Sequence, residues 1–148
     1  MFESERDFLF WLGGYFDHGS CCRVTERIYR GYPVLSINIA IYVDSNEMAA
    51  EIRDFFSFEG AKLKESNKPR KRYVYEIRAI PEALSFAYQL MPYVKIRTTD
   101  LEKVIGIINK WIDSRIESNI YKAGAREMVE RVLDVRCMKL AGKLNHHH

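Results

Sequence analysis

Histidine, cysteine and long apolar runs are scarce in this sequence. Apart from residues 146–148, which we take as the remnant of a purification tag, the one histidine is His18, so a zinc site is not expected. Cys21, Cys22 and Cys137 are too few and too unevenly spaced for a disulfide framework or a zinc knuckle. We expect them to be ordinary thiols in a reducing compartment.

The longest apolar run, residues 8–16, is about half the length of a membrane span. No signal-peptide pattern opens the chain. We therefore expect a cytoplasmic protein with no membrane partner. Glycine and proline are also few, 8 and 4 of 148 residues, and aromatic residues make up 13%, which argues against a disordered linker.

What the sequence does contain is enough for one folded domain, which we place at residues 1–145. Apolar residues form 47% of the chain and can build a sizeable core. The formal net charge of +3 is small. It allows nucleic acid as a partner without requiring it.

The first predicted helix is unusual because it is apolar on all sides. Ser4 can cap it, and it continues to Phe16 through two adjacent glycines, Gly13 and Gly14. Each glycine costs about 1 kcal/mol of helix stability relative to alanine. Such a helix fits a place where another backbone approaches closely, with a core on one side and a partner helix on the other.

The chain then repeats a strand, strand and helix order. We expect strands at residues 21–29, 34–43, 61–66 and 72–79. We expect helices at about residues 44–58, opened by Asp44, at about 81–90 and at about 123–140, and one more capped by Thr99. The fold class is α+β, with an α-β-β-α-β-β-α order in which helices cover one face of an antiparallel sheet.

Residues 12–20, Leu-Gly-Gly-Tyr-Phe-Asp-His-Gly-Ser, resemble the LAGLIDADG motif of homing endonucleases. Residues 30–32, 75–78 and 91–97 also resemble that family in order and spacing, so the match extends from the N-terminus to Trp111. The resemblance implies a LAGLIDADG homing-endonuclease-like fold. In that fold a saddle-shaped antiparallel sheet lies over the major groove of DNA.

In this family the motif helices of two copies pack against each other, whereas this chain has a single motif. The resemblance therefore implies a homodimer with two-fold symmetry. The interface residues that it assigns are Leu12, Gly13, Gly14, Tyr15 and Phe16. An ordinary buried core helix is the alternative interpretation.

The resemblance implies double-stranded DNA as the partner, with RNA as an alternative. Strand positions opposite the apolar ones carry residue types that read bases or contact phosphates. They are Arg23, Thr25, Arg27, Ser36, Asn38, Lys62, Lys64, Glu76 and Arg78. The basic residues Arg70, Lys71 and Arg72 lie at a predicted hairpin tip, where they would reach phosphates farther out. An ordinary solvated sheet face is the alternative for any one of these residues.

Cleavage in this family uses divalent ions such as Mg²⁺, held by one carboxylate from each motif over the scissile phosphates. Asp17 matches the first acid of the motif. The second acid, which holds the metal in relatives, falls on Gly19 in an ungapped alignment and on His18 when one residue is deleted. Asp17 is then either a substitute metal ligand or a carboxylate that accepts backbone hydrogen bonds.

A second departure is Ala40, near the end of a strand, where relatives commonly have glutamine or lysine. Arg97 matches a basic residue that flanks the scissile phosphates, and Lys95 accompanies it. Asp17, Arg97 and Lys95 are therefore the candidate catalytic residues, with Mg²⁺ as cofactor if the chain cuts DNA and no cofactor otherwise. We expect a DNA-binding protein that has lost cleavage. The alternatives are an active homodimeric endonuclease, an RNA maturase, a transcription regulator and a folded remnant.

Overall fold

The computed structural model describes residues 2–67, 70–118 and 125–144. The chain begins with α1 (Glu5–Gly19), β1 (Ser20–Tyr29), β2 (Tyr32–Val43), α2 (Asn46–Phe56), β3 (Lys62–Ser66) and β4 (Arg72–Ile77). It continues with α3 (Ile80–Leu90), the short 3-10 helix η1 (Met91–Tyr93), α4 (Thr98–Ser118) and α5 (Ala125–Leu140). The predicted α-β-β-α-β-β-α order is confirmed.

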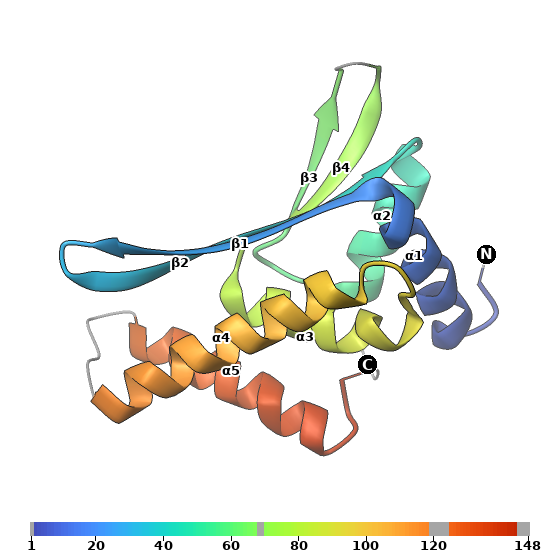
Figure 1. The fold of residues 1–148 in the computed structure, drawn as a ribbon. Coiled ribbons are helices and arrows are strands. Elements are labelled where there is room, and N and C mark those ends of the chain that lie inside the picture. Colours follow the sequence, from blue (N-terminus) through green and yellow to red (C-terminus); the bar gives the residue numbers. More distant parts are fainter. Residues whose placement is uncertain (1, 68–69, 119–124, 145–148) are drawn as a thin grey trace.

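One antiparallel sheet in the order β1-β2-β4-β3 organises the molecule. β4 pairs with β2 only from Ile39 to Val43. The rest of β2 is paired with β1 alone, so these two strands extend away as a two-stranded ribbon, and β3 with β4 projects as a second hairpin (Figure 1). The two hairpins point in different directions (Figure 1).

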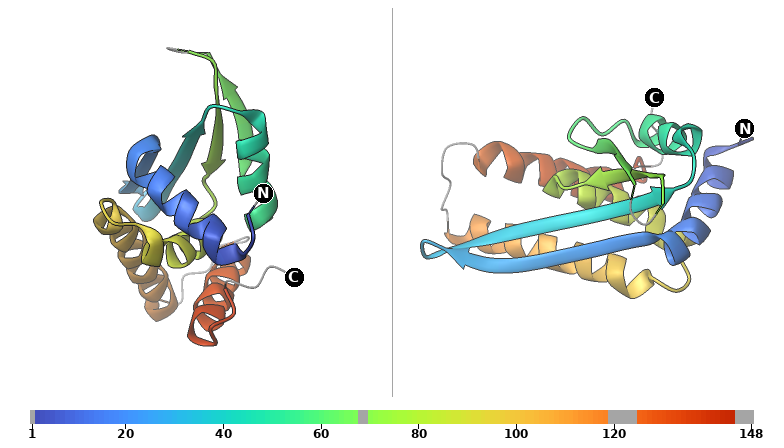
Figure 2. Two further views of the ribbon diagram at one scale, coloured as in Figure 1. Left: turned by 90° about the vertical axis from the view of Figure 1, so that its right-hand side faces the viewer. Right: turned by 90° about the horizontal axis from the view of Figure 1, so that it is seen from above.

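The helices α3, α4 and α5 lie on one side of the sheet and leave its other side uncovered (Figures 1 and 2). The inward-facing residues of β2 form part of the core because side chains alternate along a strand. Leu35, Ile37, Ile39 and Ile41 are each 8% exposed or less. α4 also supports the far end of the ribbon, where the Pro33 carbonyl oxygen accepts hydrogen bonds from the Trp111 indole at 3.3 Å and Arg115 at 2.8 Å.

The helix ends follow local sequence signals, with two differences from expectation. Ser4 caps α1 as predicted. The side chain that caps α2 is Ser45 and not Asp44, because Ser45 directly precedes the first helical residue. α4 begins at Thr98, so Thr99 is already inside the helix. The expected start of α5 lies outside the described residues, and none of the described helices has the length and apolar character that a membrane crossing requires.

Candidate nucleic-acid interface

The uncovered face of the sheet collects most of the residues predicted to contact nucleic acid. Cross-strand pairs on this face are Arg23–Asn38, Thr25–Ser36 and Lys62–Glu76. Because side chains alternate along a strand, Arg27 and Lys64 share the same face, and Arg78 follows directly after β4. The predicted common face is therefore present, and the role of each residue on it stays a prediction.

Cations dominate this face. Its basic residues are Arg23, Arg27, Lys62, Lys64, Arg72 and Arg78, and all except Arg72 are exposed. Among the described strand residues of this face Glu76 is the one acid, whereas Glu26 and Glu65 lie on the opposite face. The uncovered face therefore presents positive charge to any polyanion that approaches it.

Glu76 is held at the middle of this face by two cations. Lys64 Nζ lies 3.2 Å and Arg78 Nε 2.8 Å from the same carboxylate oxygen, Oε1. The Glu76 side chain is 12% exposed. Desolvation raises the pKa of Glu76, but the hydrogen bonds from Arg78 and Lys64 outweigh it, so this pKa lies below its ordinary value. The carboxylate is therefore ionised at neutral pH.

The three basic residues near the tip of the β3–β4 hairpin are not equivalent. Arg70 forms an ion pair with Asp44 at 3.2 Å, on the side of the hairpin that faces α1. Lys71 forms its ion pair with Glu65 at 3.0 Å, and Glu65 belongs to the opposite face of the sheet. Arg72 stacks on a tyrosine ring of β2. The three side chains therefore have different partners, and their contact with phosphates stays a prediction.

Asp17, the first acid of the motif, holds the loop that leads into α4. Its carboxylate accepts hydrogen bonds from the backbone amides of Lys95, Ile96 and Arg97 at 3.0, 3.0 and 2.9 Å. Desolvation raises the pKa of Asp17, but these three hydrogen bonds outweigh it, so this pKa lies below its ordinary value. Of the two interpretations that the sequence left open, this geometry matches the acceptor of backbone hydrogen bonds.

The Arg97 side chain is also engaged within the chain. Its guanidinium donates to the Ser20 carbonyl oxygen and, at 2.7 Å, to Ser20 Oγ, while its Nε lies 2.9 Å from an Asp100 carboxylate oxygen. Arg97 thereby joins the end of α1 to the start of α4. Lys95 is exposed. Of the two predicted phosphate-binding cations, Lys95 is the more accessible one.

The residues at the end of α1 do not fit the Mg²⁺ site that the resemblance implies. Magnesium prefers oxygen ligands, and the two possible positions of the second acid carry His18 and Gly19. The Asp17 oxygens already accept three amide hydrogen bonds. Within the described part of the chain, no three His, Cys, Asp or Glu side chains are grouped so that they could hold a metal ion.

The structure also corrects the predicted interface on α1. Leu12 and Phe16 are 0% exposed, because they lie in the core of their own chain. Gly13 does allow a close approach, but the approaching backbone is that of Tyr93, and a Cβ at position 13 would lie 2.7 Å from the Tyr93 carbonyl carbon. These three residues are therefore not available to a partner. When a helix is apolar on all sides, the sequence does not indicate which side packs against the core of its own chain.

Gly14 remains on the outside of α1. A Cβ at this position would have no heavy atom within 4 Å among the described residues. Phe10, one turn earlier, is 52% exposed. Arg6, Phe10, Gly14 and His18 recur every four residues, and all four are exposed, so they form one stripe along the helix.

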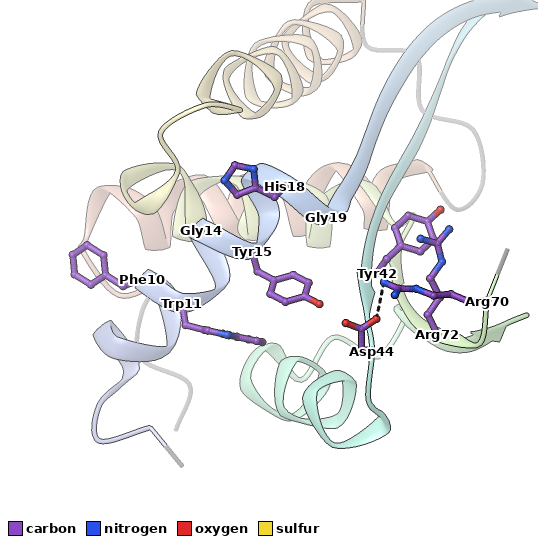
Figure 3. A pocket seen from close by; sticks show the side chains of 10 residues that line it. All are labelled: Phe10, Trp11, Gly14, Tyr15, His18, Gly19, Tyr42, Asp44, Arg70 and Arg72. Carbon is purple, nitrogen blue, oxygen red and sulfur yellow. Dashed lines mark hydrogen bonds and ion pairs between the residues drawn. The ribbon is translucent and has the colours of Figure 1, made fainter. Parts of the chain in front are cut away.

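A cleft of about 650 Å³ lies beside this stripe, between α1 and the end of β2 (Figure 3). The rings of Trp11 and Tyr15 point from α1 toward Asp44, while Phe10 projects from the other side of the helix (Figure 3). Tyr42 also lines the cleft. Sequence reasoning missed Tyr42, although the alternation of β2 places it on the uncovered face. Asp44, which is predicted to cap a helix, lines the cleft as well.

No family model matches the sequence, and no curated protein is detectably similar to it. Solved structures are similar. The homing endonuclease I-CvuI in complex with its target has a TM-score of 0.62 at 15% identity, over 93% of this chain and 96% of that one. The archaeal intron-encoded homing endonuclease I-Vdi141I, complexed with DNA, has a TM-score of 0.63 at 13% identity, over 90% and 85%.

A third structure, the LAGLIDADG homing endonuclease I-GzeII in complex with a DNA target, has a TM-score of 0.59 at 17% identity. The match covers 86% of this chain and 43% of I-GzeII. At such identities the comparison shows the fold alone. The chain has the fold of LAGLIDADG homing endonucleases, as the resemblance implied.

Proposed function

We propose that this chain, which has the LAGLIDADG homing-endonuclease fold, binds double-stranded DNA as a two-fold dimer and does not cleave it. The main support for the proposal is the cation-rich face of the sheet, which no helix covers within the described residues. Structures of similar fold, I-CvuI and I-Vdi141I, are complexes with a DNA target or with DNA.

The geometry of the ribbon suits the major groove. That groove admits a two-stranded β-ribbon. Residues on one face of a strand are about 7 Å apart, and successive base pairs rise about 3.4 Å, so each step from Arg23 to Thr25 to Arg27 advances about two base pairs. The exposed side chains of β1 can therefore follow the groove without a change of register.

The exposed stripe of α1 supports the dimer. Gly14 has no side chain, so a second helix can approach α1 closely there, and the exposed Phe10 ring provides apolar surface that this contact would bury. The match to less than half of I-GzeII is in keeping with one copy of a unit that must find its second copy in another chain. This dimer uses Gly14 and not the buried Gly13.

The proposed loss of cleavage rests on the side chains that are available as metal ligands at the end of α1. A divalent ion between two subunits needs oxygen ligands from both. The chain offers His18 and Gly19 at the candidate positions, and it uses Asp17 to hold the Lys95–Arg97 loop. Binding then depends on charge and shape, with no hydrolytic step.

Salt dependence of binding tests the DNA face. Fluorescence anisotropy with duplex DNA should show that the affinity of the unmodified protein falls steeply as the salt concentration rises. The double variant with Arg23→Ala and Arg27→Ala should have a slope of log affinity against log salt that is flatter by roughly one to two units. Lys110→Ala with Arg131→Ala removes two exposed helix cations and serves as the matched control. An unchanged slope in the β1 variant would remove the face from the proposal. No binding at low salt would indicate a folded remnant, and tighter binding to RNA would support the RNA alternative.

A plasmid assay with Mg²⁺ or Mn²⁺ tests the loss of chemistry. The unmodified protein should leave DNA intact, and His18→Asp or Gly19→Asp, made separately, should restore cutting if the missing acid is the lesion. Metal-dependent cleavage at one site by the unmodified protein would overturn this part of the proposal.

A further inference from the structure

Glu76 is an acid on the surface that we propose binds DNA, which is a polyanion. It is the one acid among the described strand residues of the uncovered face, and its carboxylate would repel a phosphate that came within hydrogen-bond distance. Lys64 and Arg78 nevertheless hold it in place, so its position is fixed. An ionised carboxylate only accepts hydrogen bonds. The group that it meets must therefore be a donor.

The two oxygens of Glu76 have different surroundings. Both cations bond to Oε1, at 3.2 Å from Lys64 and 2.8 Å from Arg78. Among the described residues no hydrogen bond reaches Oε2. The bonds to Oε1 orient the carboxylate, so Oε2 is an acceptor whose direction is already set.

The Glu76 side chain is 12% exposed, and its neighbour on β2, Ala40, is 1% exposed. A ligand can therefore reach this carboxylate only at its small exposed part, which suits a single hydrogen-bonding group.

We propose that Glu76 Oε2 accepts a hydrogen bond from the N4 amino group of a cytosine, so that each subunit selects one G·C pair in its half-site. This inference rests on the proposed DNA binding. In the major groove guanine and thymine present acceptors, and adenine presents its N6 donor beside the N7 acceptor. Cytosine is the one base that presents only a donor on its major-groove edge, so it carries no acceptor of its own that would repel a carboxylate.

Arg78 provides the complementary half of this recognition. Its Nε bonds to Glu76, and no hydrogen bond of its two terminal nitrogens occurs within the described part of the chain. A guanidinium fork donates well to O6 and N7 of guanine. The carboxylate for cytosine and the fork for guanine therefore match the two bases of one G·C pair.

Selection from a random pool of duplex DNA tests the inference with the full chain. The unmodified protein should enrich a palindromic sequence with cytosine at one fixed position of each half-site. Glu76→Gln should lose this preference, with roughly ten-fold less discrimination against the other bases, while its affinity for unselected DNA increases because one negative charge is gone. Glu65→Gln is the matched control, since Glu65 is also paired with a lysine but lies on the opposite face.

Each outcome has a distinct meaning. If Glu76→Gln enriches the same bases with the same discrimination, the inference is wrong and the proposed function stands. If the unmodified protein binds no duplex DNA, the proposed function fails, and this inference fails with it. Loss of preference for a base other than cytosine would refute the assignment. Glu76→Asp keeps the charge but shortens the side chain. It should therefore fold, which thermal unfolding can check, and it should still lose the discrimination between bases.

Discussion

Replacing Gly14 with alanine or leucine separates the stability of one chain from the association of two. In the isolated chain position 14 is exposed, and an added Cβ would have no heavy atom within 4 Å among the described residues. Alanine should then stabilise α1 by about 1 kcal/mol through helix propensity alone. For a chain of this size the midpoint of thermal unfolding should rise by roughly 2–4 °C.

In a dimer built on the exposed stripe of α1 the same change has the opposite effect. A leucine side chain at position 14 would occupy the space of the second helix, and overpacking of this kind costs about 1–3 kcal/mol. Because the interface has two-fold symmetry, the substitution introduces this cost twice, roughly 2–6 kcal/mol in total. Association is then weakened by about 30-fold or more.

Sedimentation velocity over a concentration series measures the dimer, and circular dichroism at low concentration measures the stability of the single chain. Gly106→Leu is the control, because Gly106 lies on α4 and its Cβ site is equally open. It should stabilise the chain and leave association unchanged. If Gly14→Leu associates as tightly as the unmodified protein, the contact between copies does not include this stripe.

Two further substitutions test the core side of α1. Gly13→Ala should destabilise the chain by about 1–3 kcal/mol in urea unfolding, because its Cβ would lie 2.7 Å from the Tyr93 carbonyl carbon; equal stability would show that this backbone can shift freely. Asp17→Asn should destabilise by about 1–3 kcal/mol by weakening the hydrogen bonds from three amides. Because the pKa of Asp17 is depressed in the folded state, its contribution is complete above the ordinary value of 3.8 and is lost as the pH falls through the folded pKa. The difference in unfolding midpoint between Asp17→Asn and the unmodified chain should therefore be constant from pH 7 to pH 5 and should disappear as the pH falls below 3.8. A difference that persists in acid would contradict this origin.

The sheet face could be predicted from the sequence because it depends on local alternation. Successive side chains of a strand point to opposite faces. Once Ile37 and Ile39 are assigned to the core, Ser36 and Asn38 must lie on the other side, and the pairing with β1 brings Arg23 to the same face. No long-range information is needed for this step.

The roles of Asp17 and Gly13 could not be predicted in the same way. Asp17 accepts hydrogen bonds from amides that are 78 to 80 positions later in the chain, and no local sequence pattern predicts such a contact. Gly13 and Gly14 look equivalent in the sequence, yet only Gly13 faces the backbone of η1. The direction of each glycine depends on how α1 packs, which is a property of the tertiary structure.

The support that α4 gives to the β1–β2 ribbon has a consequence for the energetics of any complex. A two-stranded ribbon alone is marginally stable and twists strongly. Here the hydrogen bonds from Trp111 and Arg115 to the Pro33 carbonyl oxygen fix the far end of the ribbon to a rigid helix. The conformational entropy of the ribbon is therefore lost during folding and not during binding, which favours affinity. Trp111 packs on the side of the ribbon that a ligand on the uncovered face does not touch, so its loss would shorten the lifetime of a complex without removing any contact to the ligand.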